Sequence, residues 1–363
     1  MEYRKNHKTG DSISIIGLGT SVINEQPEKD AIETLQYACE HGVNYADLAT
    51  AGAKTFAYFS KALGSVREKM LYQVHFGANY ATGEYGWSTD LDTVKRAVDW
   101  QLKELNTDYI DYGMIHCLDE ASDWQAYQDN GVLDFLLDMK KQGVVRHIGL
   151  SSHTPSTANL VLDTGLVDQL MFSINPGYDY QHGEFANGSA GERMALYRRC
   201  EAEGIGVTVM KPYSGGQLLD SKTSPFGQAL TPYQCIQYAL DKPGVLCVLP
   251  GMRSVEDIKE VLGFLDAPAE ARDYSVIGTF TPADAAGACV YCNHCQPCPA
   301  GLNVGLINKY YDLAVAGDPM AVEHYKKLDK KASDCISCGH CDQRCPFHVA
   351  QANRMKEISG YFG

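Results

Sequence analysis

The chain has 363 residues, 45% of them hydrophobic, and a formal net charge of −14 at pH 7. This length suits one large domain with a small one beside it, and the acidic balance argues against nucleic acid as a partner, because phosphates repel such a surface. No apolar run approaches the ~18 residues of a membrane span, so we expect no membrane partner. Residues 1–8 lack the apolar segment of a secretory signal, which favours the reducing cytoplasm, where cysteines remain thiols or metal ligands.

Strand-like apolar runs alternate with amphipathic helical stretches between residues 13 and 265, a pattern that favours a parallel sheet with helical crossovers. The expected strands are residues 13–17, 43–47, 70–75, 109–116, 145–151, 169–174, 206–211 and 245–250. Helices are expected between them, for example at residues 28–41, 91–105, 155–164 and 232–241. Eight strand–helix units predict a TIM barrel, a (β/α)8 fold of the α/β class, over residues 1–276.

Reactive side chains gather at the carboxyl ends of these expected strands, which is the face where TIM barrels carry their chemistry. They are Asp47, His75, His116, Ser151, Ser152, His153, Asn175, Lys211 and Arg253. Any one of them taken alone is more often structural, and a lone histidine is more often a satisfied loop residue. Their shared location predicts a functional site.

Two tandem cysteine motifs occupy the C-terminal part of the chain: CxxCxxCxxCP at residues 289–299 and CxxCxxCxxxCP at residues 335–346. Three thiolates in consecutive tight turns can hold three irons of one cubane, while the cysteine before proline reaches the other cluster, as in bacterial ferredoxins. We therefore expect two [4Fe-4S] clusters. We assign one to Cys289, Cys292, Cys295 and Cys345, and the other to Cys335, Cys338, Cys341 and Cys298.

Other interpretations of the cysteines are weaker. Zinc prefers two separated CxxC pairs, and disulfides are disfavoured in a reducing compartment. Two clusters can relay single electrons or can simply staple a small domain, and electron transfer is the stronger expectation. Five cysteines lie outside these motifs, and they fit the pattern of small buried hydrophobic residues: Cys39, Cys117, Cys200, Cys235 and Cys247. Cys117 is the exception of interest, because it directly follows the candidate site histidine His116.

The cysteine motifs predict a small, α-rich, ferredoxin-like domain over residues 277–363. Short helices are expected between the motifs, at residues 304–314 and 320–328. Residues 266–280 lack a clear periodicity and lie among prolines at positions 268 and 282. This stretch therefore suits a linker between the barrel and the cluster domain.

Several short segments follow one another in a familiar order. They are residues 1–10 with Ile15-Ile-Gly-Leu-Gly-Thr20, Gly42-Val-Asn-Tyr-Ala-Asp-Leu-Ala49, residues 109–116, Arg146-His-Ile-Gly-Leu-Ser151, Met210-Lys-Pro212 and Leu249-Pro-Gly251. Together they resemble the aldo-keto reductases, from the N-terminal hairpin to the last strand, and the cluster domain resembles that of the ferredoxin-tailed subgroup. The resemblance covers essentially the whole chain, and it implies a TIM barrel that exchanges hydride with a carbonyl or alcohol.

The catalytic positions match this family only in part. Its reductases use an Asp, Tyr, Lys and His tetrad, in which the tyrosine protonates the nascent alkoxide. Asp47 and His116 match the first and last positions, whereas the tyrosine position falls on Gly52 and the lysine position on His75. The joint loss of the tyrosine and the lysine makes chemical sense, because a tyrosine with a pKa of about 10 needs a neighbouring cation to act as an acid at neutral pH. Without the tyrosine, the lysine has no acid to tune.

What remains is one carboxylate and two imidazoles at adjacent strand ends. Imidazoles have intrinsic pKa values of about 6.5, which suit acid–base work at neutral pH. We therefore expect His116, or His75 polarised by Asp47, to exchange the proton with the substrate. The alternative is that these residues are a relic without catalysis at this pocket.

The resemblance also implies a nicotinamide site, whose positions again match in part. Met210 stands where the family stacks an aromatic ring on the nicotinamide, and Ser151 and Ser152 match the pair that holds the carboxamide. The expected cofactor-binding residues are Gly19, Thr20, Ser151, Ser152, Met210, Lys211, Gly251 and Arg253. NAD(H) and NADP(H) both stay open as cofactors.

The phosphate end of that nucleotide site is expected next to residues 251–253. These residues precede a helix that should begin near Ser254, and a helix N-terminus can hold a phosphate. Glu256 and Asp257, however, place negative charge near the expected position of the 2′-phosphate. NADH is therefore favoured over NADPH.

Two long loops at the same face are expected to define the substrate pocket. Their aromatic and imidazole side chains could stack on a ring, supply a replacement acid, or simply pack within the loops. The loops are residues 79–88, with Tyr80, Tyr85 and Trp87, and residues 175–184, with Tyr178, Tyr180 and His182.

These observations predict a cytoplasmic iron–sulfur oxidoreductase that acts on a small organic substrate. Its chemistry is either carbonyl/alcohol interconversion or a cluster-fed reduction such as that of a C=C bond. Its expected partner is a one-electron carrier, a ferredoxin or a flavoprotein, and nothing in the sequence decides the oligomeric state. The alternative is a non-catalytic electron-transfer or sensing subunit with a degenerate barrel.

Overall fold

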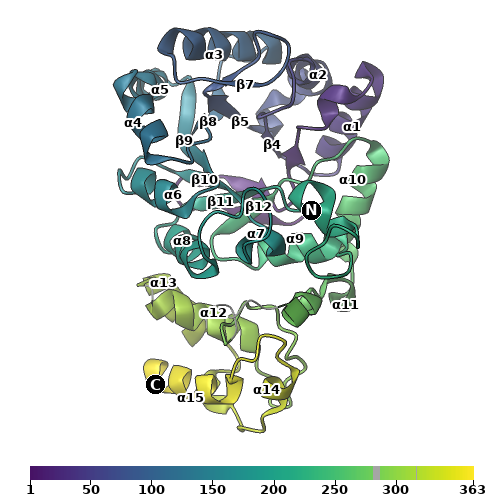
Figure 1. Ribbon diagram of the computed structural model, residues 1–363, viewed down its shortest axis with the longest axis vertical. Coiled ribbons are helices and arrows are strands. Elements are labelled where there is room, and N and C mark those ends of the chain that lie inside the picture. Colours follow the sequence, from purple (N-terminus) through teal and green to yellow (C-terminus); the bar gives the residue numbers. More distant parts are fainter. Residues whose placement is uncertain (281–286, 316) are drawn as a thin grey trace. The chain divides into compact units, whose positions relative to one another are not determined.

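The computed structural model describes residues 1–280, 287–315 and 317–363, and these fold into two compact units (Figure 1). Unit 1 comprises Met1–Ile174, Ile205–Pro212 and Leu246–Ala267. Unit 2 comprises Asn175–Gly204, Tyr213–Val245 and Pro268–Gly363. The chain therefore passes between the units several times, and unit 2 contains the cysteine motifs together with two segments from the expected barrel region. The predicted domain boundary between residues 276 and 277 stays a prediction.

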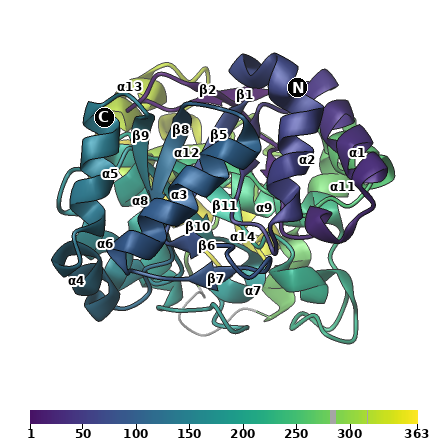
Figure 2. The same ribbon diagram turned by 90° about the horizontal axis from the view of Figure 1, so that it is seen from above.

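A curled parallel sheet forms the centre of unit 1 (Figure 2). Eight parallel strands follow one another in the order β12-β11-β10-β9-β8-β5-β4-β3. Their bounds are β3 (Leu18–Gly19), β4 (Tyr45–Asp47), β5 (Leu71–Phe76), β8 (Ile110–Ile115), β9 (Val145–Ser152), β10 (Gln169–Ser173), β11 (Gly206–Met210) and β12 (Val245–Val248). Parallel bridges between Ile16 and Val248 and between Gly19 and Gly251 bring the first and last strands together. The expected (β/α)8 barrel class is confirmed.

Burial on both faces explains why these runs form a parallel sheet. Every residue of β8 and of β10 is buried, and parallel strands covered on both faces read as nearly continuous apolar runs rather than as alternating ones. The carboxyl ends of β4, β5 and β8 are neighbours, because β5 pairs with β4 on one side and with β8 on the other. The sheet thus brings the residues that follow these three strands close together.

The first expected strand, residues 13–17, is divided in the structure. Its beginning belongs to an antiparallel hairpin of β1 (Tyr3–Lys5) and β2 (Ser12–Ser14), and the barrel strand β3 starts only at Leu18. The hydroxyl of Ser14 donates to the carbonyl of Ile16 at 2.7 Å. This local hydrogen bond competes with strand pairing and turns the chain between the two strands.

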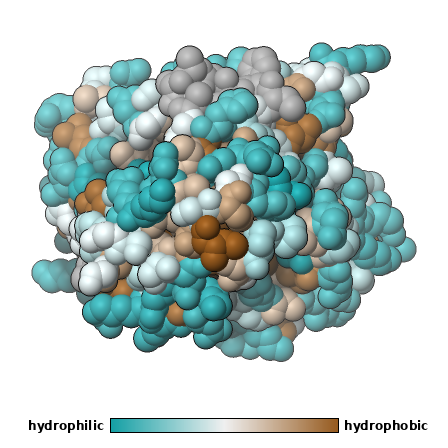
Figure 3. Space-filling view, turned by 90° about the horizontal axis from the view of Figure 1, so that it is seen from below, coloured by the Kyte–Doolittle hydropathy of each residue, from teal (hydrophilic) through white to brown (hydrophobic). Residues whose placement is uncertain are grey.

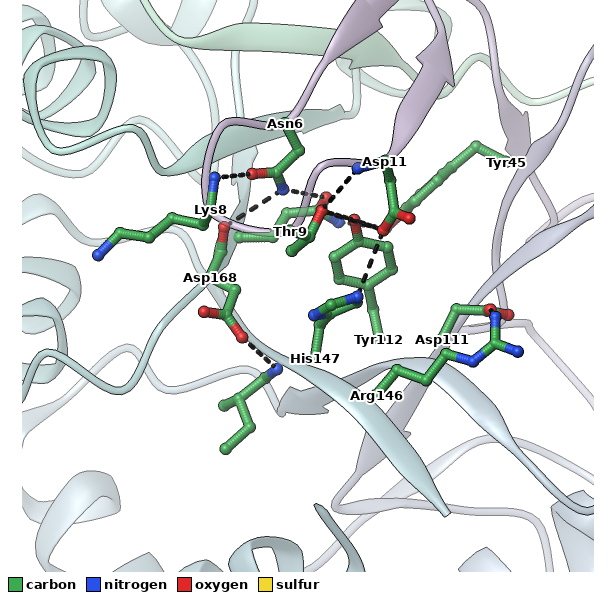
Figure 4. A network of polar contacts seen from close by, with 12 residues as sticks. Asn6, Lys8, Thr9, Asp11, Tyr45, Asp111, Tyr112, Arg146, His147 and Asp168 are labelled. Atoms are coloured by element: carbon green, nitrogen blue, oxygen red, sulfur yellow. Dashed lines mark hydrogen bonds and ion pairs between the residues drawn. The ribbon is translucent and has the colours of Figure 1, made fainter. Parts of the chain in front are cut away.

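The loop of this hairpin carries a polar network (Figure 4). The hydroxyl of Tyr112 donates to Asp11 at 2.5 Å, and Thr9 lies 3.0 Å from the same hydroxyl. Asn6 donates to the carbonyl of Asp168, and His147 lies 3.5 Å from Asp11. Since these partners stand at or just before the beginnings of strands, the hairpin covers the amino end of the barrel, which leaves the carboxyl end for a functional site.

Helices of unit 1 follow the strands as expected for βα units. They are α1 (Glu28–Glu40), α2 (Lys54–Leu63), α3 (Leu91–Leu105), α4 (Ala121–Asp129), α5 (Val132–Lys141), α6 (Pro155–Leu162) and α10 (Val255–Leu262), with the short helical turns η1 (Ile23–Glu25), η2 (Gly64–Lys69) and η4 (Gly263–Asp266). Their starts follow from the sequence: Asp90 accepts from the backbone N–H of Thr93, and Ser254 accepts from that of Asp257. No helix in the described part of the chain is long and apolar enough to cross a membrane.

Unit 2 is helical. Its helices are α7 (Pro176–Asp179), α8 (Ala190–Ala202), α9 (Pro232–Leu240), α11 (Ala269–Arg272), α12 (Val304–Val315), α13 (Pro319–Lys326), α14 (His340–Arg344) and α15 (Gln351–Phe362), with the turns η3 (Ser214–Leu219), η5 (Ser275–Phe280) and η6 (Ala332–Asp334). Leu302, Ile307, Met355 and Ile358 pack into one apolar core. Much of the stretch expected as a linker, residues 266–280, is helical in α11 and η5, and its neighbouring Pro282 lies outside the described residues.

Candidate active site and cluster sites

Four side chains at the carboxyl end of the barrel form one unbroken chain of hydrogen bonds. Asp47 ends β4, His75 stands in β5, and His116 follows β8. Asp47 Oδ1 lies 2.7 Å from Nε2 of His75, and Nδ1 of His75 lies 2.7 Å from Nδ1 of His116. The hydroxyl of Tyr85 lies 2.7 Å from Nε2 of His116. The three residues predicted as catalytic are thus brought together, and a tyrosine is added to them.

The hydrogen bonds fix the tautomers of both imidazoles when these are neutral. A carboxylate can only accept, so Nε2 of His75 carries the proton of its hydrogen bond with Asp47. Nε2 of Gln73 lies 3.1 Å from that nitrogen, and it donates its own N–H to Oδ1 of Asp47 at 3.0 Å. Nδ1 of His75 is then an acceptor, which requires the proton of His116 to lie on its Nδ1. Nε2 of His116 therefore accepts from the hydroxyl of Tyr85. Every hydrogen bond in the chain points from Tyr85 toward Asp47.

Burial supports a neutral imidazole at His116. His75 is fully buried and His116 almost so. Burial, followed by the nearby charges of His75, His153 and Lys211, holds the pKa of His116 well below its usual value. Tyr85 is 42% exposed, so the outer end of the chain is open to a small molecule while its inner end is shielded from water.

Tyr85 reaches His116 from a loop far away in the sequence. It precedes β7 (Gly86–Trp87), which pairs with β6 (Ala78–Asn79). The backbone N–H of Tyr85 donates to the carbonyl of Ala51 at 3.0 Å. The indole of Trp87 donates to the carbonyl of His116 at 3.2 Å. These two contacts hold the hairpin beside the imidazole.

At the position where the family carries its tyrosine, the side chain of Asn24 occupies the adjacent space. A Cβ atom at Gly52 would lie 2.5 Å from Nδ2 of Asn24, whose Oδ1 accepts from the backbone N–H of Lys54 at 3.1 Å. Asn24 thus fills the space beside residue 52. The absence of a tyrosine there and the presence of Tyr85 at His116 are two parts of one arrangement.

A second polar group lies close to the first. Nδ1 of His153 lies 2.8 Å from Oδ2 of Asp119, and Nε2 of His153 lies 2.9 Å from Nζ of Lys211. Cys117, Asp119 and His153 offer ligand atoms that all lie within 4.8 Å of one another. Burial raises the pKa of the Cys117 thiol to about 11, so it is protonated at neutral pH and is not an activated nucleophile.

The residues predicted to hold a nicotinamide nucleotide line the same end of the barrel. The hydroxyl of Thr20 donates to the carbonyl of Asp47 at 2.6 Å, and Gly19 donates its N–H to the carbonyl of Pro250. Ser151 accepts from the N–H of Cys117 at 2.8 Å. Three of these residues therefore have structural contacts of their own.

The expected phosphate position fits a phosphate poorly. Asp257 accepts from the backbone N–H of Arg253 at 2.7 Å, and the N–H of Asp257 itself is capped by Ser254. A carboxylate thus already uses one backbone donor that a phosphate needs. Glu256 adds a second negative charge within the same first turn of α10.

The eight motif cysteines gather into two groups in unit 2. One group, called site II, lines a single cavity and consists of Cys298, Cys335, Cys338 and Cys341. The other four motif cysteines, called site I, are Cys289, Cys292, Cys295 and Cys345. Burial first, and then the nearby thiol of Cys345 among other groups, raises the pKa of both Cys289 and Cys292, so Cys345 lies near these two. Cys341 of site II also acts on Cys295, so the two groups adjoin. Each group comprises the four cysteines that the spacing assigns to one cluster, and four thiolates suit a cubane. The assignment of a cluster to each group stays a prediction.

Site II lies near the surface of unit 2. Cys338 is exposed, and the neighbouring Ile336 is 64% exposed. Figure 3 shows that exposed apolar side chains form small spots within a largely hydrophilic surface. The chemistry of site II is therefore reachable from solvent, whereas Cys289, Cys292 and Cys295 of site I are intermediate or buried.

Comparison with known proteins identifies the family. The model of the aldo/keto reductase family matches residues 15–230. The chain belongs to the aldo/keto reductase family. A 4Fe-4S dicluster domain matches residues 285–349, so this aldo-keto reductase also carries a 4Fe-4S domain. The protein is an oxidoreductase by family, and the expected family and the expected 4Fe-4S domain are confirmed.

Its relatives are distant. An uncharacterized oxidoreductase of Bacillus subtilis, YqkF, is 24% identical over 284 residues, covering 72% of this chain and 90% of that protein. L-galactose dehydrogenase of Arabidopsis thaliana is 24% identical over 299 residues, covering 72% and 86%. The holo form of aldo-keto reductase AKR11C1 from Bacillus halodurans has a TM-score of 0.61 at 20% identity, covering 78% of this chain and 97% of that one. This last likeness concerns the fold alone.

Proposed function

We propose that this aldo-keto reductase carries out redox chemistry on a small organic substrate, with Tyr85 as the residue that exchanges a proton with it. His116, His75 and Asp47 take up or return that proton. The supporting observation is the unbroken chain of three 2.7 Å hydrogen bonds from the exposed tyrosine to the buried carboxylate. The substrate is a carbonyl or alcohol, or a compound with an activated C=C bond.

The direction of the hydrogen bonds gives the order of proton movements. During substrate oxidation, an alcohol gives its proton to the oxygen of Tyr85 as the phenolic proton moves to Nε2 of His116. The Nδ1 proton of His116 moves to Nδ1 of His75, and the Nε2 proton of His75 moves to Asp47. One proton thus leaves the substrate and one arrives at Asp47. During substrate reduction Asp47 starts with that extra proton, and the same proton transfers occur in the reverse order, from Asp47 to Tyr85 and the substrate.

This relay does without the lysine that family members use. A tyrosine acts as an acid at neutral pH only if its anion is stabilised or quickly reprotonated. Burial raises the pKa of Tyr85, which disfavours a lasting tyrosinate. A coupled transfer along His116 and His75 avoids that anion, since Tyr85, His116 and His75 each gain one proton as they lose another, and only Asp47 ends with an extra one.

The electrons come from cofactors that the chain can bind. The 4Fe-4S clusters supply single electrons when bound at sites I and II, and a nicotinamide supplies a hydride. We infer that a one-electron carrier such as a ferredoxin or flavoprotein exchanges electrons at the exposed site II. NADH is the nucleotide that the acidic first turn of α10 favours.

A comparison of tyrosine variants tests the proposal. Anaerobically purified protein is assayed with aldehydes, ketones and α,β-unsaturated carbonyls, using NADH or reduced methyl viologen as the electron source. We expect turnover in the wild type and a loss in Tyr85→Phe. Tyr3→Phe is the matched control, because Tyr3 is a comparably exposed tyrosine of unit 1 whose hydroxyl donates to the carbonyl of Gly42.

Three results would contradict the proposal. If Tyr85→Phe turns over at the wild-type rate, the tyrosine does not exchange the proton. If His116→Gln and His75→Asn both leave turnover undiminished, the relay is absent. If no substrate class reacts while the clusters still exchange electrons with methyl viologen, the barrel is degenerate and the protein is an electron-transfer or sensing subunit.

A further inference from the structure

Lys242 of unit 2 is a buried cation without a hydrogen-bond partner. It lies two residues after the end of α9 and is only 1% exposed. Among the described residues, its Nζ finds no hydrogen-bond acceptor. An ammonium taken out of water without such partners is costly, so an orphaned one points to a missing acceptor.

The protein groups around Lys242 do not supply that acceptor. Its Nζ lies 3.7 Å from the ring centroid of Tyr238, which is a cation–π contact. The carboxylate of Asp241 is bonded by the hydroxyl of Tyr274 at 2.9 Å and by the side chain of Gln237 at 2.7 Å. Asp241 acts on the charge of Lys242 but makes no hydrogen bond with it.

The second nearby carboxylate is also engaged elsewhere. Asp179 accepts from Arg193 at 2.7 Å, from Tyr197 at 2.6 Å and from Tyr238 at 2.7 Å. The guanidinium of Arg193 already neutralises it in an ion pair. Lys242 therefore faces two carboxylates whose hydrogen bonds go to other residues.

Site I lies close to Lys242. Nζ of Lys242 lies 6.0 Å from the ring centroid of Tyr274, and after the two carboxylates the thiols of Cys292 and Cys289 are the groups whose charge would bear on its ammonium. Tyr274 ties the two segments together, since its hydroxyl bonds Asp241 and also lies 3.4 Å from the carbonyl of Val290. The buried cation and the first two cysteines of site I are thus held side by side within unit 2.

We propose that Lys242 donates an N–H···S hydrogen bond to the [4Fe-4S] cluster of site I and raises its reduction potential. Reduction adds one negative charge to a cluster, and a nearby ammonium stabilises that charge. Iron–sulfur potentials are set by net charge, by hydrogen bonds to the sulfurs and by exposure. Lys242 would supply both a positive charge and a hydrogen bond to a sulfur at a buried site. It therefore tunes the potential of the cluster and does not react itself.

The two sites differ in this respect. Among the described residues that line site II, none is a lysine or arginine, and Cys338 is exposed there. The cluster of site I is therefore the stronger electron acceptor of the two. If site II exchanges electrons with a carrier, as in the proposed function, Lys242 draws the electron inward to site I.

Redox titration of the holoprotein followed by electron paramagnetic resonance tests this role, and it needs no substrate. In Lys242→Met the ratio of reduced to oxidised site I cluster at a fixed potential should fall about tenfold, the effect of one charge-assisted hydrogen bond. That change corresponds to ~59 mV for a one-electron couple. Lys242→Arg keeps the charge and should stay near the wild-type potential. Lys222→Met, which removes an exposed lysine of the same unit, is the control.

A second variant identifies which titration wave belongs to site I. Gln351 donates to the sulfur of Cys289 at 3.5 Å, so Gln351→Met should lower the potential of the same cluster that Lys242→Met affects. Iron and sulfide analysis confirms that both clusters are present in each variant. If Lys242→Met loses a cluster, Lys242→Gln replaces it and should give a smaller shift in the same direction.

The redox titrations have two kinds of result, one that supports the role of Lys242 and one that contradicts it. A lowered potential confined to the wave that Gln351→Met also shifts supports the proposal. Unchanged potentials in Lys242→Met or its Gln replacement overturn it, and so does an equal shift of both clusters. Because the readout is a potential, its failure would leave the proton relay of unit 1 untouched.

Discussion

The hydroxyl of Tyr85 lies 2.7 Å from Nε2 of His116, although the two residues are 31 positions apart in the sequence. The hairpin that carries Tyr85 is held next to Gly52 by the hydrogen bond of Tyr85 with Ala51, and it brings a phenol to the imidazole at the family's histidine position. The same chemical group thus reaches the same imidazole from another loop. The predictions for unit 1 start from this contact.

Removal of the Tyr85 hydroxyl is expected to lower the turnover rate strongly and to leave the affinity for substrate almost unchanged. Tyr85→Phe keeps the ring and removes only the proton donor, so kcat should fall by roughly 10²–10⁴-fold, the usual contribution of a positioned acid or base. KM should change little. Steady-state kinetics of Tyr85→Phe beside Tyr3→Phe checks this, and an equal effect of the two variants would rule out a special role for Tyr85.

The pH dependence of stability should reveal the neutral state of His116. Its pKa in the folded protein lies below the value of about 6.5 expected for an unfolded chain. As the pH falls through 6.5, the unfolded state binds a proton first, so stability decreases toward acid pH and is constant above about pH 7. The slope from this one group is at most ~1.4 kcal/mol per pH unit.

His116→Asn should flatten that dependence, since asparagine does not titrate in this range. Denaturation midpoints of wild type and variant between pH 5.5 and 8 provide the measurement. The difference in stability between the wild type and His116→Asn should become smaller toward acid pH, because only the wild type loses the contribution of a buried neutral imidazole. A gap that widens toward acid pH would contradict a depressed pKa for His116.

Restoring the family's tyrosine at position 52 should fail. Asn24 occupies the space that a side chain at Gly52 needs, so Gly52→Tyr should destabilise the protein by about 1–3 kcal/mol through overpacking. Adding Asn24→Gly should recover part of that loss. Thermal denaturation of the single and double variants measures the coupling, and purely additive effects would show that Asn24 is not the obstacle.

Nucleotide preference should follow the acidic first turn of α10. NADH is expected to bind more tightly than NADPH, because Glu256 stands near the expected position of the 2′-phosphate. Glu256→Gln should improve NADPH binding by about fivefold, or ~1 kcal/mol, with little effect on NADH. Fluorescence titration with both nucleotides decides this, and NADPH binding that is already tighter in the wild type would reverse the assignment.

Much of the site followed from local rules. Asp47, His75 and His116 lie at or just beyond the carboxyl ends of neighbouring strands, and the carboxyl ends of parallel strands meet at one edge of a sheet. Their proximity could therefore be predicted once the strands were recognised. The division of the first strand could not, because the hydrogen bond of Ser14 with Ile16 competes with strand pairing in a way that apolar runs do not reveal.

The cysteine spacing by itself determined the cluster chemistry, since ligands within tight turns are neighbours wherever those turns lie. Apolar runs likewise determined the barrel class, because burial on both faces leaves a local signature. Only the tertiary structure decided that Tyr85 meets His116, that Asn24 fills the space at Gly52, and that Lys242 approaches Cys289. These contacts join residues about 28 to 47 positions apart, and loop geometry and side-chain packing decide them, which no periodicity along the chain records.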